Sequence, residues 1–396
     1  MRDTSNRVLA AVNGGSGVLR LDPALVARDW LPPGRRLGLA DADYDLGERG
    51  FVCERWLGST TLADNEVGPA DEGVSFIVAG DGERISLRDA VADAADVVLG
   101  AEYAATHDGL GRLAKIFDFG ARIPYHVHPP QREADRVGRR SKDEAYYFPP
   151  GVDMGAHPET FFGVHPYIAA GPRGEALLPY LRSWDDDGIL SNAFAFRQVE
   201  EEGFFVDSGV LHAPGTAVTI ELQEDSDTLA MFQALNAGCV ISKELLFKDV
   251  SAADRAELGE RALLRWIDWE ANGDPCFYQR RRIRPVPFLV RDGAEEAWIF
   301  CGTTKFSGKR LRLAPGARVT TAERGVYNLL AWSGRGTVNG VEVVGGSPGR
   351  DELLLVHEAA TRPTEFVNTG DEDLLVVKFF GPDVNPDAPA AGVREQ

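Results

Sequence analysis

The sequence predicts a mostly β protein with two β-barrel domains and a helical insertion. Short apolar runs separated by glycine turns recur along the chain, as in FVCERWLGST, VSFIVAG and DELLLVHEA, and this texture is typical of strands. The 43 Gly and 23 Pro residues suit a turn-rich β architecture rather than disorder. A chain of 396 residues is also too long for one ordinary core, so two or three domains are expected.

The N-terminal region is expected to be an arm over residues 1–40, with a short helix over Asp22–Trp30 that ends at two prolines. Strand-like sequence follows. Ser86 then opens a short helix, because a serine cap with Asp89 three residues later forms a capping box.

Three further segments complete the expected organisation. Residues 41–240 form the first β domain, with inserted loops and helices. Residues 241–290 form a helical linker, whose helix begins at Ser251, keeps helical spacing of its apolar positions and ends at Gly273. Residues 291–390 form the second β domain, which contains no H-x-H pair and is therefore expected to hold no metal.

The charge balance limits the partners. Sixty-one acidic residues against 42 basic ones give a formal net charge of -19, which disfavours nucleic acid and anionic membrane surfaces. The four cysteines are scattered without C-x-x-C spacing, so no disulfide framework is indicated. With no apolar run approaching a membrane span, we expect a cytoplasmic enzyme or binding protein that takes a small molecule, and its oligomeric state stays open.

Four residues form a candidate metal site. His126 and His128 are two apart, and on a strand this spacing turns both imidazoles to the same face. Glu144 and His212 follow in other strand-like segments. A single histidine is more often structural, but three imidazoles and one carboxylate in β context suit Zn, Fe, Mn, Ni or Co. We therefore predict one divalent metal ion, with zinc as the first choice.

Three segments resemble the class I mannose-6-phosphate isomerases, a family of the cupin superfamily. They are LAKIFDFGARIPYHVHPP, SKDEAYYF and FFVDSGVLHAPGTAVTIELQEDSDT. The similarity runs from about Gly50 to about Asp227, with a looser match through the C-terminal β region. The resemblance implies a bicupin fold and an isomerase that interconverts aldose and ketose phosphates through a cis-enediol, with zinc holding the sugar.

The resemblance also assigns roles to single residues. It places zinc ligands at His126, where the family has Gln or His, and at His128, Glu144 and His212. Lys142 matches the family's active-site lysine, and Glu221 matches a glutamate of its sugar pocket. Such an isomerase needs a polarised carbonyl and a group that moves a proton, and Lys142 and Glu221 are the candidates. The alternatives are a surface lysine paired with Asp143 or Glu144, and a solvent-exposed carboxylate on an edge strand.

One position departs from the family. There, the SDT motif is followed by an active-site arginine, whereas this chain reads SDTLAMFQAL and has Met231 at that place. Methionine cannot offset an anion. Either another basic residue supplies the charge, such as Arg122 or one of those in Arg132–Arg140, or the substrate is an unphosphorylated sugar, which we favour.

Two rival functions stay open at this stage. A cupin oxygenase would use the same four ligands with Fe, Ni or Mn and would consume oxygen. A sugar-sensing or sugar-binding protein would have lost catalysis, and Met231 is the residue that favours this alternative.

Overall fold

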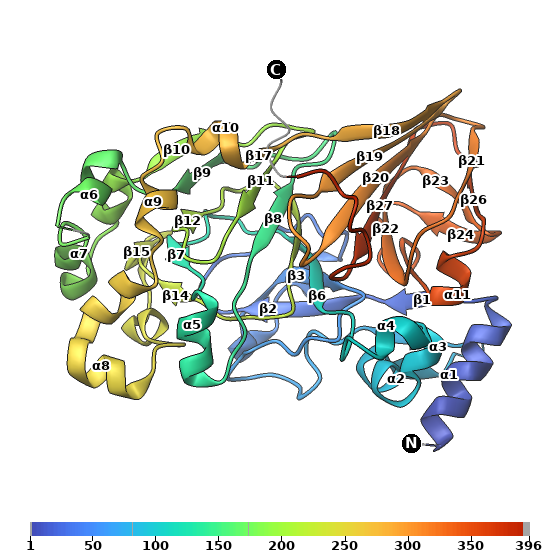
Figure 1. Ribbon diagram of the computed structural model, residues 1–396, viewed down its shortest axis with the longest axis horizontal. Helices are drawn as coiled ribbons and strands as arrows, with labels where there is room; N and C mark the ends of the chain where they lie inside the picture. Colours follow the sequence, from blue (N-terminus) through green and yellow to red (C-terminus); the bar gives the residue numbers. More distant parts are fainter. Residues whose placement is uncertain (1, 81, 173, 391–396) are drawn as a thin grey trace.

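The computed structural model describes residues 2–80, 82–172 and 174–390, and β-strands dominate them (Figure 1). The prediction of a mostly β protein is therefore confirmed. We call the seven-stranded and five-stranded sheets the first β-region, and the nine-stranded and four-stranded sheets the C-terminal β-region. The strands of these sheets pair antiparallel, which fits the short glycine-rich connections of the sequence.

The first β-region holds the candidate site. Its seven-stranded sheet has the order β17-β11-β8-β13-β6-β3-β2, with β2 (Ala24–Arg28), β3 (Phe51–Leu57), β6 (Arg112–Phe117), β8 (Glu144–Tyr147), β11 (Gly203–Val206), β13 (Thr219–Glu224) and β17 (Arg282–Ile283). Its five-stranded sheet has the order β10-β9-β12-β7-β14, with β7 (His126–Val127), β9 (Glu159–Phe162), β10 (Phe194–Arg197), β12 (His212–Ala213) and β14 (Ala230–Met231).

The C-terminal β-region takes strands from both ends of the chain. Its nine-stranded sheet has the order β18-β19-β20-β27-β22-β25-β1-β4-β5, with β1 (Val18–Asp22), β4 (Phe76–Val78), β5 (Arg84–Ser86), β18 (Val286–Arg291), β19 (Ala294–Phe300), β20 (Ser307–Leu313), β22 (Tyr327–Ser333), β25 (Glu352–Leu355) and β27 (Leu374–Phe380). Its four-stranded sheet has the order β21-β26-β23-β24, with β21 (Arg318–Thr321), β23 (Arg335–Val338), β24 (Val341–Val344) and β26 (Thr364–Asn368). A separate ribbon joins β15 (Leu235–Asn236) and β16 (Cys239–Val240).

The helices gather at two ends of the molecule (Figure 1). One group packs against β1 and β4 and comprises α1 (Arg2–Gly14), α2 (Leu87–Asp93), α3 (Ala95–Val98) and α4 (Ala101–Ala104). The other group covers the five-stranded sheet and comprises α6 (Pro166–Ala170), α7 (Leu178–Ser183), α8 (Ala252–Leu258) and α9 (Trp269–Asn272). The short helices α5 (Gln131–Ala134), α10 (Phe277–Arg281) and α11 (His357–Ala360) lie in connections.

The core between the two β-regions explains why polar side chains collect on the other face of the seven-stranded sheet. Ile116 of β6 packs in one apolar cluster with Phe300 and Val377 of the nine-stranded sheet. Neighbouring residues on a strand point to opposite faces. Lys115 therefore projects away from this core and lines the cavity of the first β-region.

Two local predictions are corrected by the structure. The helix expected over Asp22–Trp30 is wrong, because this segment contains the end of β1 and all of β2, and β2 pairs with β3. A short isolated helix is marginal in water, whereas pairing with a distant strand supplies a full hydrogen-bonded ladder. The helix that begins at Ser251 is interrupted, because Gly259 leaves the helical region with φ of 55° and a 3-10 segment follows.

Candidate metal centre

The four predicted metal ligands come from both sheets of the first β-region. His126 on β7 lies opposite His212 on β12 in register, so the five-stranded sheet brings these two imidazoles side by side. His128 follows directly after β7. Glu144 begins β8 of the other sheet. All four side chains are buried, and the two sheets thus bring together residues that are up to 86 positions apart in the sequence.

The distances place these groups around one point. The His128 Nε2 atom lies 3.0 Å from Glu144 Oε2, and the His212 Nε2 atom lies 2.9 Å from Glu144 Oε1. The candidate ligand atoms of His126, His128 and His212 lie within 4.8 Å of one another. The sequence-predicted set is therefore a single cluster in space.

The tautomer of each imidazole is fixed by the backbone. His126 donates from Nδ1 to the carbonyl of Pro124 at 2.7 Å, and His128 donates from Nδ1 to the carbonyl of Thr228 at 2.7 Å. His212 donates likewise to the carbonyl two residues before it, at 2.8 Å. Because a carbonyl only accepts, each Nδ1 atom carries a proton, and Nε2 is the nitrogen that faces a metal.

The donor set fits a bound cation. Burial and the neighbouring imidazoles hold the pKa of His126 well below its ordinary value, and burial together with Lys142 lowers the pKa of His128 to about 4. Both rings are neutral at pH 7, so lone pairs of nitrogen and carboxylate oxygen face one another. The buried His212 Nε2 atom makes no hydrogen bond at all. A divalent ion held by His126, His128, His212 and Glu144 would satisfy these atoms.

The two residues predicted to act on substrate lie beside this cluster. Lys142 Nζ is 2.9 Å from Glu144 Oε2 and 3.4 Å from Glu221 Oε1. Lys142 is 5% exposed and Glu221 is 2% exposed, and β13 lies between β6 and β8 inside the sheet. The alternatives of a surface lysine and a solvent-exposed edge carboxylate are therefore wrong.

Burial also changes the acidity of these groups. Burial raises the pKa of Glu221 to about 8, and the Glu144 carboxylate nearby adds to this, against the opposing effect of Lys115 and Lys142. Burial would lower the pKa of Lys142, but Glu144 and Glu221 outweigh it and raise that pKa. A carboxyl group with a pKa near neutrality can both accept and release a proton at pH 7.

Several charged residues of the site were not predicted. Lys115 Nζ lies 3.2 Å from Glu221 Oε2, and Arg28 on β2 bonds to Glu54 and Asp227. Lys115 interrupts the apolar run LAKIFDF, which is a signal that sequence reasoning could have used. Arg28 lies in the segment taken as a helix, so nothing local marked it.

These residues line a cavity of about 680 Å³ between the two sheets, a size typical of small-molecule sites. Its wall includes the stacked rings of Trp30 and Phe119, whose centroids are 5.3 Å apart. Met231 also lines it, next to His126 in the sheet register. The arginines suggested as substitutes do not line this cavity among the described residues. Arg122, for example, pairs with Glu159.

Comparison with known proteins finds likeness in structure only. The mannose 6-phosphate isomerase from Bacillus subtilis is 16% identical with a TM-score of 0.62, covering 91% of this chain and 99% of that chain. A variant of phosphomannose isomerase from Salmonella typhimurium is 13% identical with a TM-score of 0.62, covering 92% and 100%. A zinc-bound mannose 6-phosphate isomerase gives the same four values. These likenesses show a shared fold, and neither a protein-family model nor a curated protein matches the sequence.

Within the part of the chain that the structure describes, no helix has both the length and the apolar character needed to span a bilayer.

Proposed function

We propose that this protein is a metal-dependent aldose–ketose isomerase that acts on a sugar or sugar phosphate through a cis-enediol. One observation carries the proposal. Three buried imidazoles, each held at Nδ1 by a backbone carbonyl, meet the carboxylate of Glu144 at the wall of a polar cavity that also holds Lys142 and Glu221. Zinc is the first choice of metal, because this nitrogen and oxygen donor set suits it and a fold neighbour holds zinc.

The chemistry asks three things of the chain. A base must take the proton from C2 of the aldose, the C1 oxygen must gain a proton to give the cis-enediol, and return of a proton to C1 with loss of the C2 hydroxyl proton gives the ketose. Glu221 is the candidate for the proton at carbon, since its pKa of about 8 suits both steps. Lys142 and Lys115 hold the oxygens where negative charge develops. A bound divalent ion would polarise the same oxygens.

The finer details of the fold belong to the same proposal. We infer that the two β-regions are the two barrels of a bicupin, since each combines a large and a small antiparallel sheet. The domain limits predicted from the sequence, 41–240 and 291–390, stay a prediction; the first β-region also takes β2 and β17 from outside 41–240, and the C-terminal β-region also takes β1, β4 and β5.

The test is a panel of hexoses, pentoses and their phosphates, offered to the full chain with added zinc. We expect isomerisation of at least one member, with exchange of the C2 proton for deuterium in heavy water. Sugar binding without exchange would instead make this a sugar-binding protein, and oxygen uptake with iron would make it an oxygenase.

A matched pair of variants assigns the proton carrier. Glu221→Gln is expected to lower kcat by about 10²–10⁴-fold, the usual contribution of a general base, while zinc stays bound. Glu224→Gln is the control, because Glu224 lies on the same strand but pairs with Lys305. Equal loss in both variants would remove Glu221 from the mechanism.

A further inference from the structure

A row of alternating charges runs through the cavity to the metal centre. It begins at Asp227, whose carboxylate lies 3.3 Å from Arg28, and Arg28 lies 2.9 Å from Glu54. Lys115 follows, 3.7 Å from Glu54 and 3.2 Å from Glu221. Lys142 then links Glu221 to Glu144. Every cation of this row therefore lies between two carboxylates.

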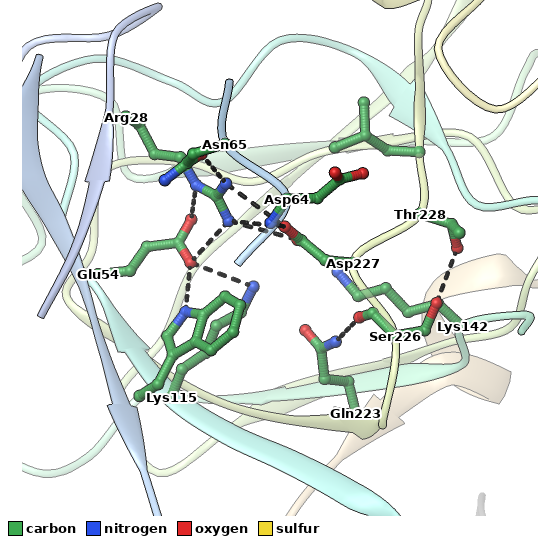
Figure 2. Close-up of polar contacts among 12 residues, drawn as sticks. Arg28, Glu54, Asp64, Asn65, Lys115, Lys142, Gln223, Ser226, Asp227 and Thr228 are labelled. Atoms are coloured by element: carbon green, nitrogen blue, oxygen red, sulfur yellow. Dashed lines mark hydrogen bonds and ion pairs between the residues drawn. The ribbon is translucent and has the colours of Figure 1, made fainter. Parts of the chain in front are cut away.

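The guanidinium of Arg28 has no donor left for a ligand (Figure 2). Its Nε and Nη2 atoms donate to the two oxygens of Glu54, at 2.9 Å and 3.3 Å. Its Nη1 atom donates to Asn65 Oδ1 at 3.0 Å, and both Nη atoms contact Asp227 at 3.3–3.4 Å. An arginine offers five N–H groups, and five separate acceptor atoms surround this one.

The partners of Arg28 are held in place in turn. The indole Nε1 of Trp56 donates to Glu54 Oε2 at 2.8 Å, and the backbone N–H of Asp64 donates to Asp227 Oδ2 at 3.1 Å. Burial would raise the pKa of Glu54, but Arg28 and Lys115 outweigh it and lower that pKa to about 2. Arg28 likewise outweighs burial and lowers the pKa of Asp227, so both carboxylates are ionised at neutral pH and Arg28 stays paired with them.

The cations on the outer wall of the cavity are paired with carboxylates as well. Arg49 pairs with Glu72, and Lys248 pairs with Asp64 at 3.2 Å. Arg255 pairs with Glu244. The lining contains more carboxyl groups than cationic side chains, before a bound metal ion is counted. The acidic residues are Asp29, Glu48, Glu54, Asp64, Glu66, Glu144, Glu221, Asp227 and Glu244, against Arg28, Arg49, Lys115, Lys142, Lys248 and Arg255.

Such a lining offers a phosphate no uncommitted guanidinium but suits hydroxyl groups. Each of the Lys115 and Lys142 ammoniums contacts two carboxylates and so keeps one N–H free for a neutral acceptor. Glu221 Oε1 makes no hydrogen bond and can accept one from a hydroxyl. Trp30 and Phe119 offer apolar ring surface to the C–H groups of a sugar.

We propose that this site takes an unphosphorylated sugar, and that the pairing of Arg28 with Glu54 and Asp227 is what excludes a phosphate. The inference rests on the proposed function for the location of the substrate. It names Arg28, a residue of the N-terminal strand β2, as the determinant of substrate class in a cavity where position 231 carries methionine.

The test measures binding without turnover, so that it stands apart from the isomerase assay. Zinc-loaded full-length protein is titrated calorimetrically with mannitol and sorbitol, with the 6-phosphates of both, and with inorganic phosphate. We expect the neutral polyols to bind at least about tenfold more tightly than their phosphates, because a phosphate loses its hydration in the cavity without gaining an uncommitted guanidinium.

A pair of variants tests the role of Arg28 itself. Asp227→Asn keeps the shape of the carboxylate but removes one charge from Arg28, and it is expected to tighten binding of the phosphorylated polyols while the neutral ones change little. Asp249→Asn is the matched control, because Asp249 is a buried aspartate nearby that accepts from the N–H of Leu229 and makes no contact with Arg28. Circular dichroism verifies folding, and the wild-type titrations decide the proposal if Asp227→Asn does not fold.

Each outcome bears on a separate claim. Tighter binding of the phosphates by the wild type overturns the inference, and so does the absence of polyol binding at millimolar concentration. Binding of neutral polyols with no isomerisation of any sugar leaves the inference standing and removes the proposed function. Isomerisation confined to phosphosugars leaves the proposed function standing and removes the inference.

Discussion

Two buried clusters of charge, one in each β-region, differ in how their central polar atoms are paired. In the C-terminal β-region, Lys378 on β27 donates to Glu296 at 2.7 Å, to Glu323 at 2.8 Å and to Thr321 Oγ1 at 3.0 Å. An ammonium has three protons, so this lysine is saturated. In the first β-region, His212 Nε2 and Glu221 Oε1 are buried without a hydrogen bond.

The difference shows where a ligand is needed. Lys378 is completely buried and lies over the ring of Phe366, 4.7 Å from its centroid, so the C-terminal cluster is closed by protein atoms. The metal centre instead borders a cavity. Leaving a buried polar atom unpaired is costly, and such atoms beside a cavity indicate an ion and a substrate. We therefore expect mutations at the candidate metal centre to change metal content and activity. Mutations in the C-terminal cluster should change the free energy of unfolding.

The largest effect is expected from His128→Ala. The variant loses one of four proposed ligands, so the zinc content should fall from one ion per chain to near zero. Activity should fall by more than the roughly 10–100-fold typical of a change outside the ligand set. Elemental analysis after dialysis and the sugar panel measure both. His157→Ala is the control, because His157 is a half-exposed histidine that does not line the main cavity. Full zinc content in His128→Ala would remove the metal site.

The next effect is expected from Lys378→Met in the C-terminal cluster. Removing this ammonium leaves Glu296 and Glu323 buried with less compensation, and breaking a buried ion pair in this way typically costs about 3–5 kcal/mol. Chemical denaturation measures the loss. Zinc content and kcat of the folded fraction should stay unchanged, and a drop in zinc would contradict the separation of the two clusters.

The sequence predicted the parts of the site that are local in the chain. His126 and His128 form an H-x-H pair, and Lys142 and Glu144 form a K-x-E pair, so strand periodicity alone placed each pair on one face. The mostly β class and the serine caps at Ser86 and Ser251 also depend on local sequence patterns, and the structure confirms them.

Arg28 shows why the rest was missed. Its partners lie 26 and 199 residues away in the sequence, at Glu54 and Asp227, and β2 exists only because β3 pairs with it. No local pattern reports such contacts. Its segment, ALVAR, lacks the alternation of a half-buried strand, since four of its five residues are buried in the folded chain.

A buried glutamate at the boundary between the two β-regions is expected to make the free energy of unfolding depend on pH, and this effect is of intermediate size. Glu352 on β25 accepts from Arg55 on β3 at 3.1 Å, and burial, with Asp351 nearby, raises the pKa of Glu352 to about 7. The folded state therefore keeps a proton that the unfolded chain releases near pH 4.5, so stability falls as pH rises through this window and the full loss is present above pH 7. The loss is about 3 kcal/mol at 1.36 kcal/mol for each pKa unit.

Glu352→Gln should make this fall in stability between pH 5 and pH 8 smaller, and Glu221 with its pKa of about 8 accounts for a part that remains. Urea denaturation of chelator-treated protein at pH 5 and pH 8 gives the difference for wild type and variant. Glu358→Gln, which changes an exposed glutamate of α11, should leave the slope unaltered. An unchanged slope in Glu352→Gln would mean that the carboxyl of Glu352 is ionised over the whole range, and that Arg55 dominates over burial.

The smallest effect compares the same local chemistry in the two regions. Ser86 caps α2, which belongs to the helix group on β1 and β4, and Ser251 caps α8, in the group that covers the five-stranded sheet. Each hydroxyl accepts from a backbone N–H, at 3.2 Å and 3.1 Å. Loss of such a cap typically costs about 1 kcal/mol, so Ser86→Ala and Ser251→Ala should lower the free energy of unfolding by similar amounts. Similar losses in denaturation would place the contrast between the regions in their buried charges. A loss several times larger for Ser251→Ala would instead point to its second hydrogen bond, because Ser251 also donates to Asp254 Oδ2 at 2.6 Å.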